Sequence, residues 1–195
     1  MDVVMTLFEL HTHLKHAGFN RWGISPARLY TKNEQGQTPL DFLSDECSEQ
    51  GLQALAVTKY DFSNKAAFAT QSPAFNVIES EAPNAVNVLR ILFDHGLRIN
   101  ATDHHGNNAL HLACEQGLKT IAMLLIEKGI DYTSKNDLGQ TAFDVIPEAA
   151  EGFMVPALNR AIKHYKKAGL AAGISAISNL FHNNPVFHKQ KKASE

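Results

Sequence analysis

Cysteines, net charge and long hydrophobic runs are all scarce in this chain. Its 195 residues include only two cysteines, which cannot build a disulfide framework or a four-cysteine zinc site. We expect Cys47 to lie in an exposed loop, Cys114 to be inert between packed helices, and the compartment to be reducing and cytoplasmic. The net charge of −2 creates no field that attracts nucleic acid. No stretch approaches the roughly 18 apolar residues of a membrane span.

The motifs of common enzyme classes are also missing. The sequence has no G-x-S-x-G elbow, no glycine loop for phosphates and no H-E-x-x-H zinc motif. His11, His13 and His16 do not share one helical face, so they are not a convincing ligand set. No further ligands converge on His104 and His105. We therefore predict no catalytic site, no metal and no cofactor. The N-terminal segment is not expected to be a signal peptide.

The stretch DHHGNNALHLACEQG, residues 103–117, combines a turn, a helix start and a helix stop. Its first four residues are typical of a turn, and Asn108 is a favourable N-cap for the helix that follows. Gly117 supplies the left-handed conformation that ends many helices. Apolar residues recur at helical spacing over 118–125 and predict a second helix, which Gly129 ends. Neither helix can bury its apolar stripe alone.

The same unit recurs along the chain. Gly139 follows Gly106 by 33 residues and repeats both the turn and the helix start. Another copy carries Gly36, which lies 70 residues before Gly106, or about two periods. A degenerate copy fills the gap, with Ser72 as N-cap and Pro73 as first helical residue. Repetition at this period predicts a stack of helix pairs.

The period of 33 residues and the turn–helix–helix content resemble the ankyrin repeat family. Residues 103–117 match its pattern D-x-x-G-x-T-P-L-H-x-A-A-x-x-G, with Asn108 in place of threonine and Ala109 in place of proline. The resemblance implies an all-α, ankyrin-type helical repeat solenoid of about four repeats, of which the third and fourth are closest to the pattern. We place the repeats at residues 33–66 (divergent), 67–102 (degenerate), 103–135 and 136–167.

Both ends of the predicted stack carry capping elements. Residues 1–32 hold an N-terminal cap helix and a connection. We expect an inner helix in the fourth repeat, a final outer helix from about Val155, and then a separate C-terminal cap helix at 168–182 that covers the last repeat. Residues 183–195 are polar and basic, and we expect a flexible tail there.

The resemblance also implies where a partner binds. In ankyrin stacks the turn tips and inner helices form a concave face, and contacts come from residues beside the turn glycine and late in each inner helix. By the same resemblance, His111 has the structural role of bonding the neighbouring turn. The candidate partner-binding residues are Asp45, Glu79, Glu115, Glu148, His104, His105, Asn107, Gln116, Leu138 and Gln140.

One column of these positions is acidic in all four repeats. It consists of Asp45, Glu79, Glu115 and Glu148, each expected late in an inner helix. An acidic ladder of this kind would favour a partner with a basic contact surface. The competing interpretation is a solvated helix face, where glutamate is common because of its helix propensity.

These observations predict a monomeric, non-catalytic module that binds a partner protein through its concave face and turn tips. A first alternative is a secreted bacterial effector, which would use the stack to engage a protein in the host cytoplasm. A second is a small enzyme with catalytic residues outside the repeats, and a third is a self-assembling structural piece. Nucleic acid is not a predicted partner, and no membrane span is predicted.

Overall fold

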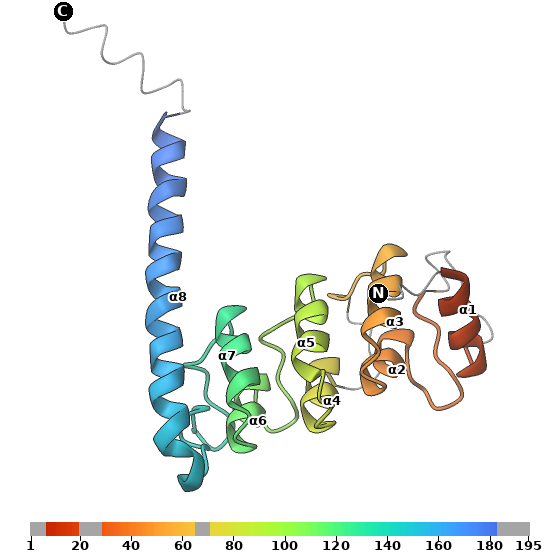
Figure 1. The fold of residues 1–195 in the computed structure, drawn as a ribbon, viewed down its shortest axis with the longest axis horizontal. Helices are drawn as coiled ribbons and strands as arrows, with labels where there is room; N and C mark the ends of the chain where they lie inside the picture. The colour runs from red at the N-terminus through yellow and green to blue at the C-terminus, as the bar shows by residue number, and fades with distance from the viewer. Residues whose placement is uncertain (1–6, 20–28, 65–70, 183–195) are drawn as a thin grey trace, which may run out of the picture.

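The computed structural model describes residues 7–19, 29–64 and 71–182, and within these ranges the side chains from residue 9 to residue 167. Two rows of helices stack side by side along the molecule (Figure 1). The inner row consists of α2 (Pro39–Asp45), α4 (Pro73–Glu79) and α6 (Ala109–Glu115). The outer row consists of α1 (Leu7–His16), α3 (Glu49–Val57), α5 (Ala85–Asp94), α7 (Lys119–Glu127) and α8 (Glu148–His182). Within the described residues there are no strands, only two isolated bridges at the turns.

Short polar residues precede the inner helices, as the sequence predicts. Ser72 makes no side-chain capping hydrogen bond to α4, whereas the residues before α2 and α6 do cap their helices. Thr38 caps α2, where its hydroxyl accepts from the backbone N–H of Asp41 and the Asp41 carboxylate accepts from the backbone N–H of Thr38. Asn108 caps α6 by accepting from the backbone N–H groups of Leu110 and His111. Caps of this kind stabilise a helix by about 1 kcal/mol. They allow helices of only seven residues to begin at defined positions.

The two weaker repeats end their inner helices without glycine. Gly117 follows α6 with φ +69°, and the equivalent residues after α2 and α4 are Cys47 and Glu81, with φ of 49° and 51°. The left-handed conformation costs such residues roughly 1 kcal/mol. The backbone geometry of the repeat is therefore kept where its sequence signature is lost.

The core is a continuous layer of aliphatic side chains between neighbouring helices. Leu43, Leu55, Leu89, Leu110 and Leu125 are completely buried, and they come from different helices of both rows. Burying a side chain of this size contributes about 1.5–3 kcal/mol. Each helix supplies one face to this layer, so the fold depends on contacts between neighbours.

Cys47 is buried, and the expectation of an exposed loop is wrong. Its side chain is 8% exposed, with the sulfur 3.3 Å from the hydroxyl oxygen of Ser80 in the next repeat. The left-handed turn at the end of α2 points the Cys47 side chain towards the interface between repeats. A prediction of a loop from sequence does not show this direction.

The N-terminal helix completes the outer row. Leu10 and Leu14 of α1 are fully buried, and α1 packs on α3 as the other outer helices pack on each other. This agrees with the predicted N-terminal cap helix. Most of the expected connection between this helix and the first repeat lies outside the described residues.

The fourth repeat departs from the prediction because it has no inner helix. Residues 142–146 form turns, and α8 begins directly afterwards at Glu148. Pro147 explains the difference: a proline disfavours helical geometry in the residue before it and is well suited to a helix start. The predicted helix at this position would have had to run through that proline.

The C-terminal helix is also longer than predicted. We expected separate helices from about Val155 and over 168–182, but α8 is continuous from Glu148 to His182. It passes through Pro156, which removes the hydrogen bond to the carbonyl of Gly152. Both residues are exposed, so water can satisfy that carbonyl. The predicted capping contacts involve the side chains of 168–182, which lie outside the described side chains. The predicted tail at 183–195 lies outside the described residues.

His111 links the third repeat to the turn that follows it. The side chain is 1% exposed, with Nδ1 2.7 Å from Asn108 Oδ1 and Nε2 3.1 Å from the backbone oxygen of Gln140. The Asn108 side-chain amide donates in turn to the backbone oxygen of Asp131. These bonds carry the structural role that the resemblance implies for His111.

We predict that His111→Ala lowers the free energy of unfolding by about 1–3 kcal/mol, because it leaves the backbone N–H of Asn108 and the backbone oxygen of Gln140 without this partner. Urea denaturation followed by circular dichroism measures the loss. The matched control is His104→Ala, at an exposed histidine, which should change stability by less than about 0.5 kcal/mol. Equal losses in the two variants would contradict the structural role of His111.

Candidate functional site

Three turns at the edge of the stack are built in the same way. Asn33, Asp103 and Asn136 each use a side-chain oxygen to accept the backbone N–H of the residue four positions later, at 2.8–2.9 Å. Each turn is closed by a bond from the first residue's backbone N–H to the backbone oxygen of that same later residue. For Asp103, partial burial opposes ionisation, but bonds from Asn107 and His105 hold its pKa below the ordinary value. The tips are therefore held in one shape.

The tips of the third and fourth repeats are joined to each other. The backbone N–H of Asp137 donates to the backbone oxygen of His105 at 3.0 Å, and the Asn136 amide donates to Asn107 Oδ1 at 2.9 Å. Gly106 makes this approach possible. A Cβ at this residue would lie 2.7 Å from Asp137 Oδ1 and 3.1 Å from its backbone nitrogen.

Three predicted contact residues stand at these joined tips. His104 and His105 are exposed, and their ring centroids are 3.9 Å apart. Leu138 is 82% exposed at the tip of the next turn. Two imidazoles and an unshielded leucine can offer a partner polar, aromatic and apolar contacts at once.

The other three predicted contact residues near the turns contribute mainly to the structure of the repeats. Asn107 and Gln140 are half-buried, and both belong to the hydrogen bonds that close and join the turns. Gln116 is exposed and is the C-cap residue of α6. Of these three predicted contacts, Gln116 has the most accessible side chain.

The acidic column is present in three repeats. Asp45, Glu79 and Glu115 are exposed, and each is the last residue of its inner helix, in α2, α4 and α6 respectively. These helices are neighbours in the inner row. The structure thus brings the three carboxylates to equivalent places along one edge of the stack.

Glu148 does not belong to this column, and its predicted place on an inner helix is wrong. It is the first residue of α8, which packs in the outer row. The shift follows from the missing fourth inner helix. A carboxylate in the first turn of a helix is favoured by the helix dipole, so Glu148 has a local structural explanation.

Asp45 differs from the other two acids because its carboxylate is already hydrogen-bonded. One oxygen accepts from the Gln37 amide and the other from the Asn76 amide, both at 2.7 Å. Asn76 accepts in turn from Gln71 at 2.7 Å. Sequence reasoning missed Asn76 as part of this surface. Its position three residues before Glu79, and so on the same helical face, was the available signal.

The arrangement offers binding groups and no recognised reaction centre. Within the described residues, no group of three or more His, Cys, Asp or Glu side chains could hold a metal ion. Both cysteines are buried, and burial raises the pKa of the Cys114 thiol to about 12, so its nucleophilic thiolate is scarce near neutral pH.

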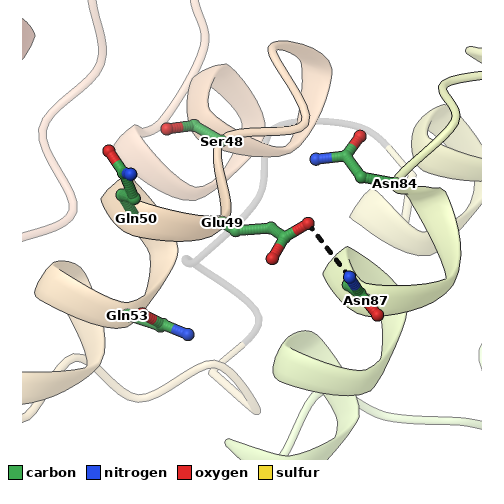
Figure 2. Close-up of a pocket in the computed structure, with 6 residues that line it drawn as sticks. All are labelled: Ser48, Glu49, Gln50, Gln53, Asn84 and Asn87. Carbon is green, nitrogen blue, oxygen red and sulfur yellow. Dashed lines mark hydrogen bonds between the residues drawn. The ribbon is translucent and has the colours of Figure 1, made fainter. Parts of the chain in front are cut away.

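The outer row carries a separate polar hollow, shown in Figure 2. It has a volume of about 610 Å³ and lies between α3 and α5. Glu49 reaches across it and accepts a hydrogen bond from Asn87 at 3.3 Å. Its lining residues are Ser48, Glu49, Gln50, Gln53, Asn84 and Asn87. None of them was a sequence candidate, because their facing positions depend on how two repeats stack.

The geometry defines a class of protein, a helical repeat solenoid with ordered turn tips. A family profile described as ankyrin repeats, in three copies, matches residues 46–136. A solved structure, the ankyrin repeat domain of Bcl-3, superimposes with a TM-score of 0.57 at 24% identity, covering 68% of this chain and 57% of that one. Residues 46–136 therefore match ankyrin repeats, and the fold is a helical repeat solenoid of the ankyrin type.

Several characterised proteins share this region. Mouse protein phosphatase 1 regulatory subunit 12A is 30% identical over 109 residues, which are 53% of this chain and 10% of that protein. The Caenorhabditis elegans homolog of ankyrin repeat and LEM domain-containing protein 1 is 33% identical over 89 residues, or 46% and 12%. Mouse B-cell lymphoma 3 protein homolog is 27% identical over 108 residues, or 55% and 23%. The chain spans between about a tenth and a quarter of the length of these three relatives.

Ankyrin repeats mediate protein–protein interactions, and they are typically non-catalytic. A further observation concerns membranes: across residues 7–19, 29–64 and 71–182, none of the helices combines the length and apolar character that crossing a bilayer requires.

Gly106→Ala should destabilise the protein more than Gly139→Ala. Both glycines have positive φ, 74° and 76°, so each substitution introduces strain of about 1 kcal/mol. A Cβ at Gly139 meets nothing within 4 Å, whereas a Cβ at Gly106 displaces Asp137 and adds about 1–3 kcal/mol from the weakened bond to His105. Urea denaturation gives the two losses. The Asp137 amide should also exchange its hydrogen faster in the Gly106 variant and not in the Gly139 variant. Equal stability and equal exchange in the two variants would refute the joined tips.

Proposed function

We propose that the chain is a non-catalytic binding module whose protein partner presents basic residues to the inner-helix ends and turn tips. The observation that carries this proposal is the placement of Asp45, Glu79 and Glu115. Each carboxylate lies at the C-terminal end of a helix, where the helix dipole disfavours negative charge by about 0.3–1 kcal/mol. Helix stability therefore does not explain an acid at this place in three successive repeats.

The three acids are compatible with a stable free protein. Neighbouring packed helices are about 8–10 Å apart, which is close to the Debye length at physiological salt. Repulsion between hydrated carboxylates at that spacing is weak. A basic partner would convert the same row into complementary contacts, which raise the association rate and select among partners.

Glu79 and Glu115 are the acids most available to a partner. Among the described residues neither makes a hydrogen bond or ion pair, whereas both oxygens of Asp45 are occupied by Gln37 and Asn76. We assign Asp45 to the support of the surface, and Glu79 and Glu115 to partner contact. His104, His105 and Leu138 would then bind at the adjoining tips.

Replacing Glu79 and Glu115 together by glutamine should weaken partner binding about tenfold, since each exposed charge pair contributes about 0.2–1 kcal/mol. Peptide ligands selected from a random display library on the wild-type protein serve as probes. Fluorescence titration at several salt concentrations measures their affinity. Selected peptides should be rich in lysine and arginine, and the double variant should show a shallower salt dependence.

The matched control replaces Glu127 and Glu151 by glutamine. These acids are exposed on α7 and α8 of the outer row, so this variant removes the same charge away from the proposed surface, including the Glu127 partner of Arg90. It should bind the selected peptides as the wild type does. Equal weakening in both double variants would assign the effect to net charge, and selected peptides without basic residues would contradict the proposed partner chemistry.

A further inference from the structure

The charges of this chain are divided between its two parts. Residues 159–195 contain seven lysines and arginines and one glutamate, which gives a net charge of +6. Residues 1–158 contain 11 basic and 19 acidic residues, which gives −8. The overall value of −2 therefore hides an acidic repeat stack followed by a strongly basic C-terminal part.

Four of these basic residues, Arg160, Lys163, Lys166 and Lys167, lie on α8, which extends beyond the stack. Ala150, Met154, Leu158 and Ala161 are buried on the α7 side in the first half of the helix. The helix then continues to His182, and Figure 1 shows its C-terminal half projecting past the end of α7. No other described helix lies beside this projecting part.

The residues of the projecting part form an amphipathic sequence without charge. Residues 168–182 contain no Lys, Arg, Asp or Glu. At about 100° per residue, positions 170, 174, 177 and 181 share one side of the helix, and the sequence has Leu, Ile, Ile and Phe there. Ser175, Ser178 and Asn179 occupy positions on another side.

This apolar stripe is in register with the side of α8 that faces away from the stack. At about 100° per residue, the stripe lies roughly 180° around the helix axis from the centre of the buried positions 150, 154, 158 and 161. Towards the N-terminus the stripe continues through Lys167 and Lys163, which are exposed.

We propose that residues 159–182 of α8 bind the surface of an anionic membrane. The stripe joins the exposed Lys163 and Lys167 to an uncharged apolar segment. The lysines match a layer of anionic head groups, and the apolar residues match the acyl boundary beneath them. The helix would lie in the plane of the interface while the acidic stack remains in water, repelled by the same head groups.

A second copy of the chain is a weaker match for the stripe. A parallel pair of α8 helices would bring Lys163 and Lys167 of both copies together, and like charges at neighbouring positions repel. An acidic bilayer surface meets both the basic and the apolar residues of the stripe without that conflict. Self-association is therefore an outcome that the experiment must be able to reveal.

The test is flotation of the full chain with vesicles of phosphatidylcholine alone or with added phosphatidylserine. We expect binding to the anionic vesicles only, with an affinity that falls as salt is raised. Lys163→Gln with Lys167→Gln should reduce partitioning about 30-fold, at roughly a 1 kcal/mol contribution per lysine. Ile174→Ser with Ile177→Ser should reduce it more than tenfold by removing buried apolar surface.

The matched control is Lys15→Gln with Lys32→Gln, which removes the same charge from exposed positions in the N-terminal part. It should bind anionic vesicles as the wild type does. Circular dichroism and thermal melting verify that all variants are folded. The proposal is overturned by wild-type protein that does not float with anionic vesicles, by equal binding to neutral vesicles, or by a control variant as impaired as the Lys163 and Lys167 variant. A stable dimer in analytical ultracentrifugation that Ile174→Ser with Ile177→Ser dissolves, without vesicle binding, would assign the stripe to a second copy.

Discussion

No helix pair in this chain can bury its apolar face without a neighbour. The inner helices α2 and α6 have seven residues each, which is too short for stability as isolated helices. Leu43, Leu89 and Leu110 become completely inaccessible only because adjacent repeats close over them. Every other feature of the molecule, from the positions of the turns to the row of acids, depends on this repeated contact.

The buried polar links show how that contact also orders the surface. His111 reaches from α6 to the backbone oxygen of Gln140, and Asn108 reaches to that of Asp131. These bonds set the third turn against the fourth, where Gly106 leaves room for Asp137. The exposed His104, His105 and Leu138 are therefore carried by a backbone that the core and its polar links hold in place.

The apolar faces at the two ends of the stack are covered in different ways. At the N-terminus α1 adds an outer helix, with Leu10 and Leu14 buried against the first repeat. At the C-terminus α8 takes the outer position, and turns replace the last inner helix. The first half of α8 serves the stack, and its second half projects from it. One helix thus joins the stack, which carries the proposed acidic binding surface, to a basic segment with a different chemistry, and the two proposed functions occupy separate parts of the chain.

The repeat period and the helix starts could be predicted from the sequence, because they depend on local features, whereas the role of His111 was implied by the family resemblance. Caps such as Thr38 and Asn108 act within four residues, and glycine stops act within one turn. The divergent repeats were harder to recognise because Cys47 and Glu81 adopt a left-handed backbone conformation that their residue types do not predict. Pro147 was a local signal for the absence of the fourth inner helix, but the repeat pattern around it favoured the wrong assignment.

Only the tertiary structure decided which polar groups meet. Asp45, Glu79 and Glu115 look equivalent in sequence, yet Asp45 alone is bound by Gln37 and Asn76, because the stacking of α4 on α2 brings Asn76 within reach. The sequence by itself determined that there would be a stack of helix pairs, since apolar spacing and capping are properties of neighbouring residues. Which carboxylates stay free, and which side of α8 faces away from the stack, depend on packing between residues distant along the chain, and no local pattern specifies that.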